Sequence, residues 1–483
     1  MLRLKPRFLA RSLAVVVVAV GVAGLGAASA GSQRIASHRF PTVKPALTDV
    51  QLVSSALTLP TEAQCFAIGR RCFTASSMEN SYNLRPLYAS GNEGQGVTIA
   101  IIDSFGNPTM ADDLANFDTQ MGLPHMCGEP GQACGDGIPT FTHVYWNGKT
   151  QVKSPPPNSQ GTGLQERDGW IVETALDVEW AHAMAPLANI INVTTNPAET
   201  QGVQGLPQMM DAEQFIVDHH QATVITQSFG TTEENFDGTQ SLLNLRHAFV
   251  SAAQNGVTVL ASTGDFGTAN PGKTPVSDPA TIPFPTVNWP ASDPLVTGVG
   301  GTYLCSDPIT GAGVDSVDPP VNCQSNPGIR EIGWIDAGGG FSHVFARPSY
   351  QDALPAGSTP IGDMRGVPDV AFQASSRTAP LVFAGGSGGG WFLVGGTSCS
   401  SPMFAGIVAI ADQVAGHGLG LINPTLYALA SGPGYASDFY DETTGNNQAD
   451  PDVPGYPATP GWDPVTGVGT PNAANLVPAL AAG

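Results

Sequence analysis

The sequence predicts an α/β fold with a parallel central sheet flanked by helices on both faces. From residue 96 onward, short β-rich runs alternate with runs of helical pattern. In chain order these runs are GVTIAIID, DLANFDTQMGL, ANIINVTT, DAEQFIVDHHQA, ATVITQSFG, SLLNLRHAFVSAAQNG and VTVLASTGD. Such alternation is typical of a parallel sheet covered by helices. Functional side chains are expected where strands of this kind end, as they do at QSFG and STGD.

The first 30 residues predict a secretory signal peptide. Four basic residues precede a long apolar run, and the run ends in Ala28-Ser29-Ala30, a small-residue cleavage signature. A membrane anchor is the alternative, but no charged stop-transfer patch follows the run. We therefore expect a secreted, extracellular chain with a signal peptide at 1–30, a short leader at 31–75 and one large domain at 76–483.

The charge balance excludes nucleic acid as a partner. The chain has 19 basic and 40 acidic residues, and cleavage after residue 30 leaves 15 and 40, a net charge of −25. A surface of this sign repels phosphates. Charged residues make up only 12% of the chain, against about a quarter in ordinary soluble domains. Few ion pairs are then lost when carboxylates are protonated, which suits an acidic medium.

Seven cysteines in a chain expected to be exported indicate disulfides. Proximity in sequence alone suggests three pairs, namely Cys65 with Cys72, Cys127 with Cys134, and Cys305 with Cys323. Cys399 is then left over. We expect it to be a small buried hydrophobe rather than a reactive thiol.

Ser398 is the candidate nucleophile. It follows a glycine-rich turn and opens the apolar segment SPMFAGIVAIADQ, which predicts a helix with Pro402 in its first turn. A hydroxyl at this place lies beside free backbone N–H groups, where acyl transfer needs both a nucleophile and an oxyanion site. A serine hydroxyl is inert without a base, so a base must lie close by.

A histidine base is the first possibility. Asp103 ends the first strand, where the aspartate of a subtilisin-like Ser/His/Asp triad would lie. None of the seven histidines between Asp103 and Ser398 is followed by glycine at a helix start, as that arrangement requires. The triad therefore lacks its histidine in the sequence.

A carboxyl pair in the segment DGWIVETALDVEWAHAMAP is the better candidate. Glu173 and Asp177 lie four residues apart on one helical face, among mainly apolar neighbours. Like charges at this spacing destabilise a helix, and burial of both ionised groups would cost more. A shared proton removes both costs. The alternative is a pair of solvated carboxylates on an exposed stripe, and solvation is what we expect for Glu179 on the same helix.

Specific motifs follow one another over nearly all of residues 76–483. They include ETALD, AHAMAP, STGDFG, FPTVNWPASDPLVTGVGGT, GGGFSHVFARPSYQ, GVPDVAF, GGTSCSSP and GWDPVTGVGTP. In this order they resemble the sedolisin family of serine-carboxyl peptidases. The resemblance implies a subtilisin-like fold and a secreted endopeptidase that acts on proteins or peptides. It implies Ser398 as nucleophile, Glu173 as general acid/base, Asp177 as its hydrogen-bonded partner and Asp265 in the oxyanion hole.

The roles that the resemblance implies for these carboxyl groups require an acidic pH. Asp265 can stabilise an oxyanion only as a neutral acid that donates its O–H. Glu173 and Asp177 must hold roughly one proton between them, so the pH profile reports the group of carboxyls rather than single residues. Because ordinary carboxyl pKa values are about 4, we expect most activity below about pH 6.

The resemblance also implies one structural calcium ion near the C-terminus. Its implied ligands are the carboxylates of Asp441 and Asp463 and the carbonyls of Glu442, Thr459 and Gly461. Oxygen ligands with two carboxylates suit a hard cation. Without the resemblance, these are turn-forming residues. Family members commonly carry a longer, folded prosegment than residues 31–75 allow, so the way in which the chain is kept inactive stays open.

Other functions remain open. One is a subtilisin-like peptidase that uses Asp103. Another is an esterase whose nucleophile is Ser387. This serine lies in GGSGG, the one match to the motif G-x-S-x-G in the sequence, and that match lies in a glycine run. A third is a catalytically silent secreted binding protein on the same fold. We expect SFG at 228–230 and GGGF at 338–341 to line the cleft. No membrane partner is expected after signal cleavage, and a monomer is the expected state.

Overall fold

The computed structural model describes most of the chain. The described residues are 44–45, 47–155, 164–195, 205–272, 280–315, 321–387 and 389–483. The expected signal peptide and the start of the expected leader lie outside the described residues. Among the described helices, none combines the length and apolar character needed to span a bilayer.

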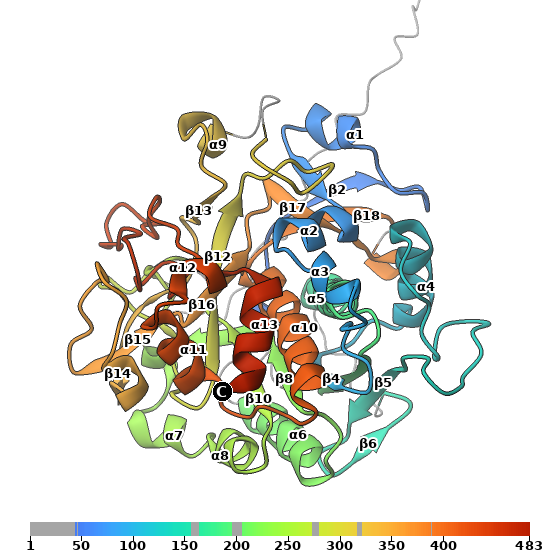
Figure 1. The fold of residues 1–483 in the computed structure, drawn as a ribbon. Coiled ribbons are helices and arrows are strands. Elements are labelled where there is room, and N and C mark those ends of the chain that lie inside the picture. Colours follow the sequence, from blue (N-terminus) through green and yellow to red (C-terminus); the bar gives the residue numbers. More distant parts are fainter. Residues whose placement is uncertain are drawn as a thin grey trace, which may run out of the picture. The chain divides into compact units, whose positions relative to one another are not determined.

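Nine of the described strands form one central sheet (Figure 1). They are β4 (Thr98–Ser104), β5 (Phe141–Trp146), β6 (Gln151–Val152), β7 (Asn189–Thr195), β8 (Val224–Gln227), β10 (Thr258–Ser262), β12 (Thr297–Leu304), β13 (Glu331–Gly333) and β16 (Val370–Gln373). Their order is β13-β12-β10-β8-β4-β7-β5-β6, and β16 also pairs with β12. All pairs are parallel except those of β6 and β13 at the two ends. The predicted α/β class is confirmed.

The described helices surround this sheet (Figure 1). They are α1 (Glu62–Ala67), α2 (Ala75–Ser81), α3 (Arg85–Tyr88), α4 (Met110–Met121), α5 (Leu164–Met184), α6 (Leu206–Asp218), α7 (Thr239–Leu243), α8 (His247–Gln254), α9 (Val321–Ser325), α10 (Thr397–Ala415), α11 (Asn423–Ala430), α12 (Tyr435–Asp438) and α13 (Ala473–Ala482). Of these, α5 and α10 pack against each other, while α6 packs against α8. The segment SLLNLRHAFVSAAQNG, expected as one helix, forms both α7 and α8. The break begins at Asn244, whose short polar side chain favours turns over helix interiors.

Strand β4 shows how helices on both faces bury the sheet. Ile99 and Ile101 belong to the apolar core that contains α5 and α10. Their neighbours Ala100 and Ile102 belong to the second core, which contains α6 and α8. Successive residues of a strand point to opposite faces, so a strand that is buried on both faces is apolar throughout. This explains the apolar run that predicts β4.

The expected leader is part of the same body as the rest. A four-stranded sheet has the order β2-β18-β17-β3. Its strands are β2 (Thr48–Ser54), β3 (Arg71–Phe73), β17 (Thr378–Phe383) and β18 (Trp391–Gly395). Since β2 and β3 both come before residue 76, the expected boundary at that residue does not separate two bodies.

Three smaller sheets complete the described strands. They are β1-β9-β11, with β1 (Lys44–Pro45), β9 (Phe229–Thr232) and β11 (Asn288–Trp289); β14-β15, with β14 (Gly340–Ala346) and β15 (Met364–Val367); and β19-β20, with β19 (Phe439–Tyr440) and β20 (Thr470–Pro471). Strand β1 pairs with β9 in antiparallel register.

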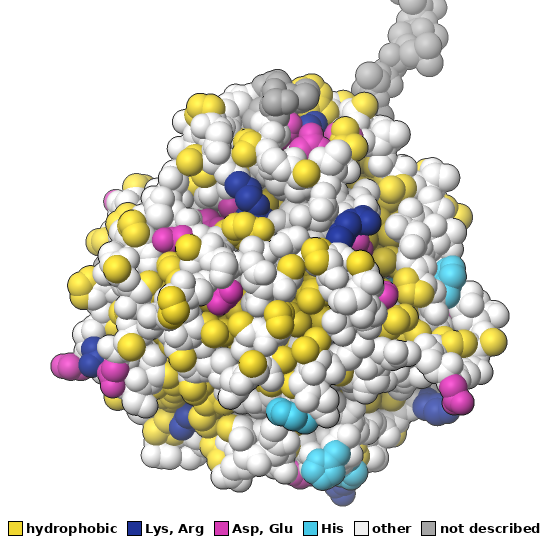
Figure 2. All heavy atoms as spheres, viewed as in Figure 1, with side chains coloured by type: hydrophobic (Ala, Val, Ile, Leu, Met, Phe, Trp, Pro, Cys, Tyr) yellow, Lys and Arg dark blue, Asp and Glu magenta, His cyan; other side chains and the backbone are white. Residues whose placement is uncertain are grey.

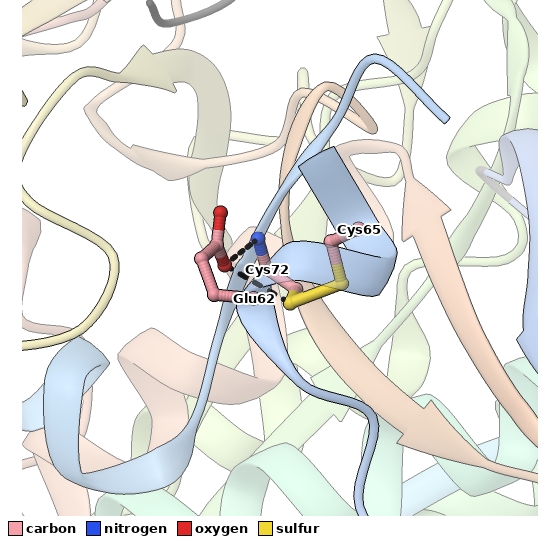
Figure 3. Close-up of side chains that lie close together, drawn as sticks. All are labelled: Glu62, Cys65 and Cys72. Atoms are coloured by element: carbon pink, nitrogen blue, oxygen red, sulfur yellow. Dashed lines mark hydrogen bonds between the residues drawn. A yellow bond between two sulfur atoms is a disulfide. The ribbon is translucent and has the colours of Figure 1, made fainter. Parts of the chain in front are cut away.

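The three predicted disulfides are confirmed, as Cys65–Cys72, Cys127–Cys134 and Cys305–Cys323. Figure 3 shows the first, which joins α1 to β3 beside Glu62. The Glu62 carboxylate accepts a hydrogen bond from the backbone N–H of Cys72 at 3.1 Å and lies 2.5 Å from the Arg71 guanidinium. Cys399 is free and fully buried, as expected.

The surface reflects the low charge content of the sequence. On the face shown in Figure 2, charged side chains are few and scattered among hydrophobic and neutral polar atoms. Acid can therefore protonate surface carboxylates here without breaking many ion pairs, in agreement with the expectation from composition.

Candidate active site

Ser398 is the second residue of α10, which begins directly after Gly395 at the end of β18 and Gly396 at the turn. Gly396 has a φ of 138°, a conformation that side chains rarely allow, so glycine is needed at the turn. The Ser398 hydroxyl is fully buried and donates to the Ser228 carbonyl at 3.4 Å. Pro402 lies in the second turn of α10 rather than in the first as predicted. Its missing N–H leaves the Ser398 carbonyl without the usual partner inside the helix.

Glu173 is the carboxyl group next to this hydroxyl. It extends from α5 and is fully buried, and neither of its carboxylate oxygens accepts a hydrogen bond from a described residue. Burial raises the pKa of Glu173 well above its usual value, and the nearby hydroxyls of Ser398 and Ser228 oppose the shift. The structure therefore brings Glu173 and Ser398 together as the sequence predicts.

Asp177 is the second buried carboxyl on α5. Its Oδ1 accepts a hydrogen bond from the Ser228 hydroxyl at 2.8 Å. Burial, followed by the charges of Glu173 and Asp103, raises the pKa of Asp177 well above its usual value. Neighbouring carboxyls that cannot all ionise in an apolar interior must retain protons. The shared proton expected for Glu173 and Asp177 fits these surroundings.

Asp103 is a third carboxyl in the same cluster, and the sequence did not assign it this role. It ends β4, is fully buried and accepts a hydrogen bond from the Asn192 side chain at 2.7 Å. Burial raises its pKa to about 7, while the Asn192 hydrogen bond and the nearby Thr174 hydroxyl and Asp177 carboxyl act in the opposite direction. Asp103 thus lies near the Asp177 carboxyl group and not beside the histidine of a Ser/His/Asp triad. Its place at the end of a strand was the signal that could have indicated it.

Asp265 follows β10 and is tied to the residue before Ser398. Its Oδ1 accepts hydrogen bonds from the backbone N–H of Thr397 at 2.8 Å and from the Thr397 hydroxyl at 3.0 Å. Its Oδ2 is buried and has no hydrogen-bond partner among the described residues. Burial raises the pKa of Asp265 to about 7. In weak acid Asp265 is therefore neutral and has one oxygen free to donate an O–H.

The histidine alternative finds no support in the described part of the chain. None of the seven histidines between Asp103 and Ser398 forms a hydrogen bond with either residue; they are His125, His143, His182, His219, His220, His247 and His343. The esterase alternative lacks its context as well. Ser387 ends a short 3₁₀ turn that leads towards β18, and not a strand-to-helix turn.

The expectation that Glu179 is solvated is wrong, because its side chain is fully buried. Its carboxylate accepts a hydrogen bond from the Phe383 N–H at 3.0 Å, and burial raises its pKa well above the usual value. The reason is that α5 is covered on every side, and all of residues 169–184 are buried. A helix of this kind has no solvated face.

Both segments expected to line the cleft lie beside these groups. Ser228 of SFG contacts both Ser398 and Asp177. The Gly338 N–H of GGGF donates to the Gly264 carbonyl at 2.8 Å, next to Asp265. A Cβ at Gly338 would lie 2.1 Å from the Thr263 carbonyl oxygen, so only glycine fits against this strand end.

Comparison with known proteins agrees with this geometry. A model described as the subtilase family matches residues 94–420, more than half of the chain. The chain belongs to the subtilase family. All four predicted catalytic residues lie within the matched range, whereas the predicted calcium ligands lie beyond it.

The relatives of this subtilase confirm its resemblance to the sedolisins. Kumamolisin of Bacillus sp. (strain MN-32) is 29% identical over 428 residues, which cover 87% of this chain and 65% of kumamolisin. Tripeptidyl-peptidase 1 of Homo sapiens is 32% identical over 342 residues, which cover 66% of this chain and 53% of that protein. The chain thus spans between about half and two thirds of the length of these curated relatives.

A solved structure confirms the subtilisin-like fold. Pseudomonas sedolisin, a serine-carboxyl proteinase solved with two molecules of pseudo-iodotyrostatin, matches with a TM-score of 0.63 at 24% identity. The match covers 86% of this chain and 99% of that one.

The predicted calcium ligands of the subtilase lie close together. The Gly461 N–H donates to both oxygens of Asp441 at 3.1 Å, and the Thr459 N–H donates to Asp463 at 2.9 Å. No described N–H or O–H donates to the carbonyls of Glu442, Thr459 or Gly461. The ligand types fit Ca²⁺, because the set offers two carboxylates and three carbonyls, and no described basic side chain forms an ion pair with Asp441 or Asp463. The Glu442 side chain is directed elsewhere, to the Thr470 hydroxyl at 2.9 Å.

The buried carboxyls predict a protein that is more stable in acid than at neutral pH. Asp103 and Asp265 have folded-state pKa values of about 7, against about 3.9 for an unfolded aspartate. Because the folded state holds these protons more tightly than the unfolded state, the two aspartates add fully to the free energy of unfolding below about pH 4. This addition is lost as the pH rises through about 7. We expect the free energy of unfolding, measured by denaturant titration of the Ser398→Ala variant to prevent self-digestion, to fall from pH 4 to pH 7.

Adding Asp265→Asn should make this pH dependence shallower, whereas adding Asp452→Asn at an exposed aspartate should leave it unchanged. A free energy of unfolding that rises from pH 4 to pH 7 in the Ser398→Ala protein would contradict the prediction.

Proposed function

We propose that this chain is a secreted serine-carboxyl endopeptidase that hydrolyses proteins or peptides in acid. The observation that carries the proposal is the buried Ser398 hydroxyl beside Glu173, in a cluster with Asp177 and Asp103. Nucleophilic hydrolysis needs a base near the hydroxyl, and here that base is a carboxylate. The names of the relatives, which are peptidases, support the same activity.

The proposed mechanism follows from these contacts. Ser398 Oγ attacks the substrate carbonyl while Glu173 takes the hydroxyl proton. Asp177 shares a proton with its neighbours, holds Glu173 in place and is itself fixed by the Ser228 hydroxyl. Neutral Asp265 donates its free O–H to the developing oxyanion, where a charged carboxylate would repel it. Glu173 then returns its proton to the leaving amine, and water hydrolyses the acyl-enzyme by the reverse sequence.

An extended polypeptide is the substrate that the edge of strand β9 favours. The chain's own strand β1 already pairs with β9 in antiparallel fashion, with Lys44 opposite Gly230 and Pro45 opposite Phe229. Strand β9 begins directly after Ser228, the residue that contacts both Ser398 and Asp177. Addition of a strand is a common way to bind an extended peptide. Substrate would take the place of β1 at this edge of β9 and so reach the nucleophile.

Calcium has a structural role in the proposal. The residues that would hold it are Asp441, Glu442, Thr459, Gly461 and Asp463, and the ion would supply the positive charge that two carboxylates lack. We further propose that the protein acts outside the cell as a monomer. A low charge content and three disulfides support such a location.

Ser398→Ala should abolish hydrolysis without loss of the fold. We expect kcat/KM for a denatured protein substrate at pH 4 to fall by about 10³-fold or more, since no other group forms the acyl bond. The matched control is Ser400→Ala, because Ser400 is equally buried on α10 and its hydroxyl bonds only to the Phe372 and Gln373 carbonyls at 3.2 Å. Retained activity in Ser398→Ala would reject the mechanism.

Asp265→Asn and Asp265→Ala should differ in their pH profiles. Loss of an oxyanion donor costs about 10²- to 10³-fold in kcat, and we expect that loss for alanine. Asparagine donates at every pH, so its loss should be smaller and its activity should persist further into the alkaline limb. A wild-type optimum at neutral or alkaline pH, measured with the same peptide, would contradict the carboxyl mechanism.

Removal of calcium should destabilise the protein. A ligand at about 100 times its Kd stabilises the folded state by about 2.7 kcal/mol, so chelation should lower the Tm by several degrees. Asp463→Asn should abolish this response, and Asp452→Asn should preserve it. An unchanged Tm in wild-type protein verified as metal-free would show that the site is absent.

A further inference from the structure

A group of metal-ligating side chains lies at the end of α4, apart from the residues assigned above. Asp118 comes from the last turns of α4, and His125 and Glu129 come from the segment that follows it. One ligand atom of each, two carboxylate oxygens and an imidazole nitrogen, lies within 4.8 Å of the other two. Such a set can surround one small cation.

Asp118 is the observation that points to a ligand. Its side chain is 0% exposed, and neither carboxylate oxygen accepts a hydrogen bond from a described residue. The Nε2 of His182 lies 3.4 Å from Oδ2 and 3.0 Å from the Pro124 carbonyl oxygen, so this histidine is the basic neighbour of Asp118. A buried carboxylate without hydrogen bonds is costly unless a cation or a proton compensates it.

Glu129 adds a second buried carboxylate to the same space. Its side chain is 0% exposed and contacts the Nδ1 of His125 and the N–H of Met126. No lysine or arginine among the described residues forms an ion pair with Asp118 or Glu129. Two carboxylates and an imidazole therefore converge, and the basic side chains that pair with these carboxylates among the described residues are histidines only, His125 with Glu129 and His182 with Asp118.

The backbone holds these ligands in position. Gly122 ends α4 with a φ of 76°, and the N–H groups of Gly122 and Leu123 both donate to the Asp118 carbonyl. Between the two other ligands, Cys127 is joined to Cys134 and exchanges backbone hydrogen bonds with Pro139 and Phe141. A ligand set held this firmly by its supporting residues binds with little reorganisation.

We propose that Asp118, His125 and Glu129 form a binding site for a divalent transition metal, and that it takes Zn²⁺. Two carboxylate oxygens and one imidazole nitrogen make a three-ligand zinc site, with the fourth position left for water. The imidazole distinguishes this site from the all-oxygen set proposed for Ca²⁺. His125 is 31% exposed, so its side gives the ion a path from solvent. The bound ion links α4 to the disulfide-closed segment.

A second group of potential ligands differs from the group around Asp118. Glu62, Cys65 and Cys72 also lie within ligand distance of one another. Figure 3 shows that both sulfurs belong to one disulfide, so neither is a thiolate ligand. The Glu62 carboxylate, moreover, already pairs with Arg71. The group around Asp118 contains no sulfur, and its carboxylates pair with histidines rather than with an arginine.

The test is a Zn²⁺ titration of the full chain. It uses the Ser398→Ala protein stripped of metal, at pH 7, where an ordinary imidazole is unprotonated. Excess Ca²⁺ is present throughout, so that the calcium site is filled. Bound zinc is counted by elemental analysis after dialysis, and the Tm is measured in parallel. We expect one zinc per chain and a Tm that rises with zinc concentration.

Paired variants make the outcome decisive. His125→Ala, at a partly exposed ligand, should lose the zinc and the rise in Tm, whereas His417→Ala at an exposed histidine should keep both. Asp118→Asn should lose them too, whereas Glu213→Gln, which changes another buried carboxyl without hydrogen bonds, should keep them.

Absence of bound zinc in the parent protein, or zinc retained in folded His125→Ala, would overturn the proposal. Neither result depends on peptidase activity.

Discussion

The arrangement of the site depends on one constraint: carboxyl groups are buried together, and no basic side chain among the described residues forms an ion pair with them. Glu173, Asp177 and Asp103 form one such cluster, and Asp265 lies beside it. Full ionisation of this cluster in an apolar interior would cost more than the fold can supply. The folded protein must therefore retain protons that water-exposed carboxyls release near pH 4. Chemistry in acid follows from this constraint, because both a base and a neutral donor are then present at once.

The parallel sheet is what gathers these groups. Strands β4, β8 and β10 are neighbours, and their carboxyl ends lead to Asp103, Ser228 and Asp265 respectively. Helices α5 and α10 pack against each other and bring Glu173 and Ser398 to the same place. Residues that are far apart in sequence thus meet because parallel strands end at one edge. The polar groups lie within a largely apolar core, which makes their pKa values high.

The sequence predicts what depends on local pattern and misses what depends on spatial neighbours. Alternating runs predict the sheet and its helices, and apolar surroundings indicate that Glu173 and Asp177 are buried. The same reasoning fails for Glu179, because only the tertiary structure covers the remaining face of α5. For Asp103 the sequence offers only an alternative triad that lacks its histidine, because the proximity of Asp103 to Asp177 joins separate elements. The ligands at Asp118, His125 and Glu129 follow no recognised metal-binding spacing, so only the fold brings them together.

The most direct test of the central claim is a count of protonated carboxyls at pH 6, by infrared absorption of the carboxylic acid C=O group in the Ser398→Ala protein. The account predicts an acid band that persists at this pH and loses intensity when Glu173→Gln or Asp177→Asn is added. Asp452→Asn, at an exposed aspartate, should leave the band unchanged. A band of equal intensity in all four proteins would show that the cluster is ionised at pH 6, which would contradict the account.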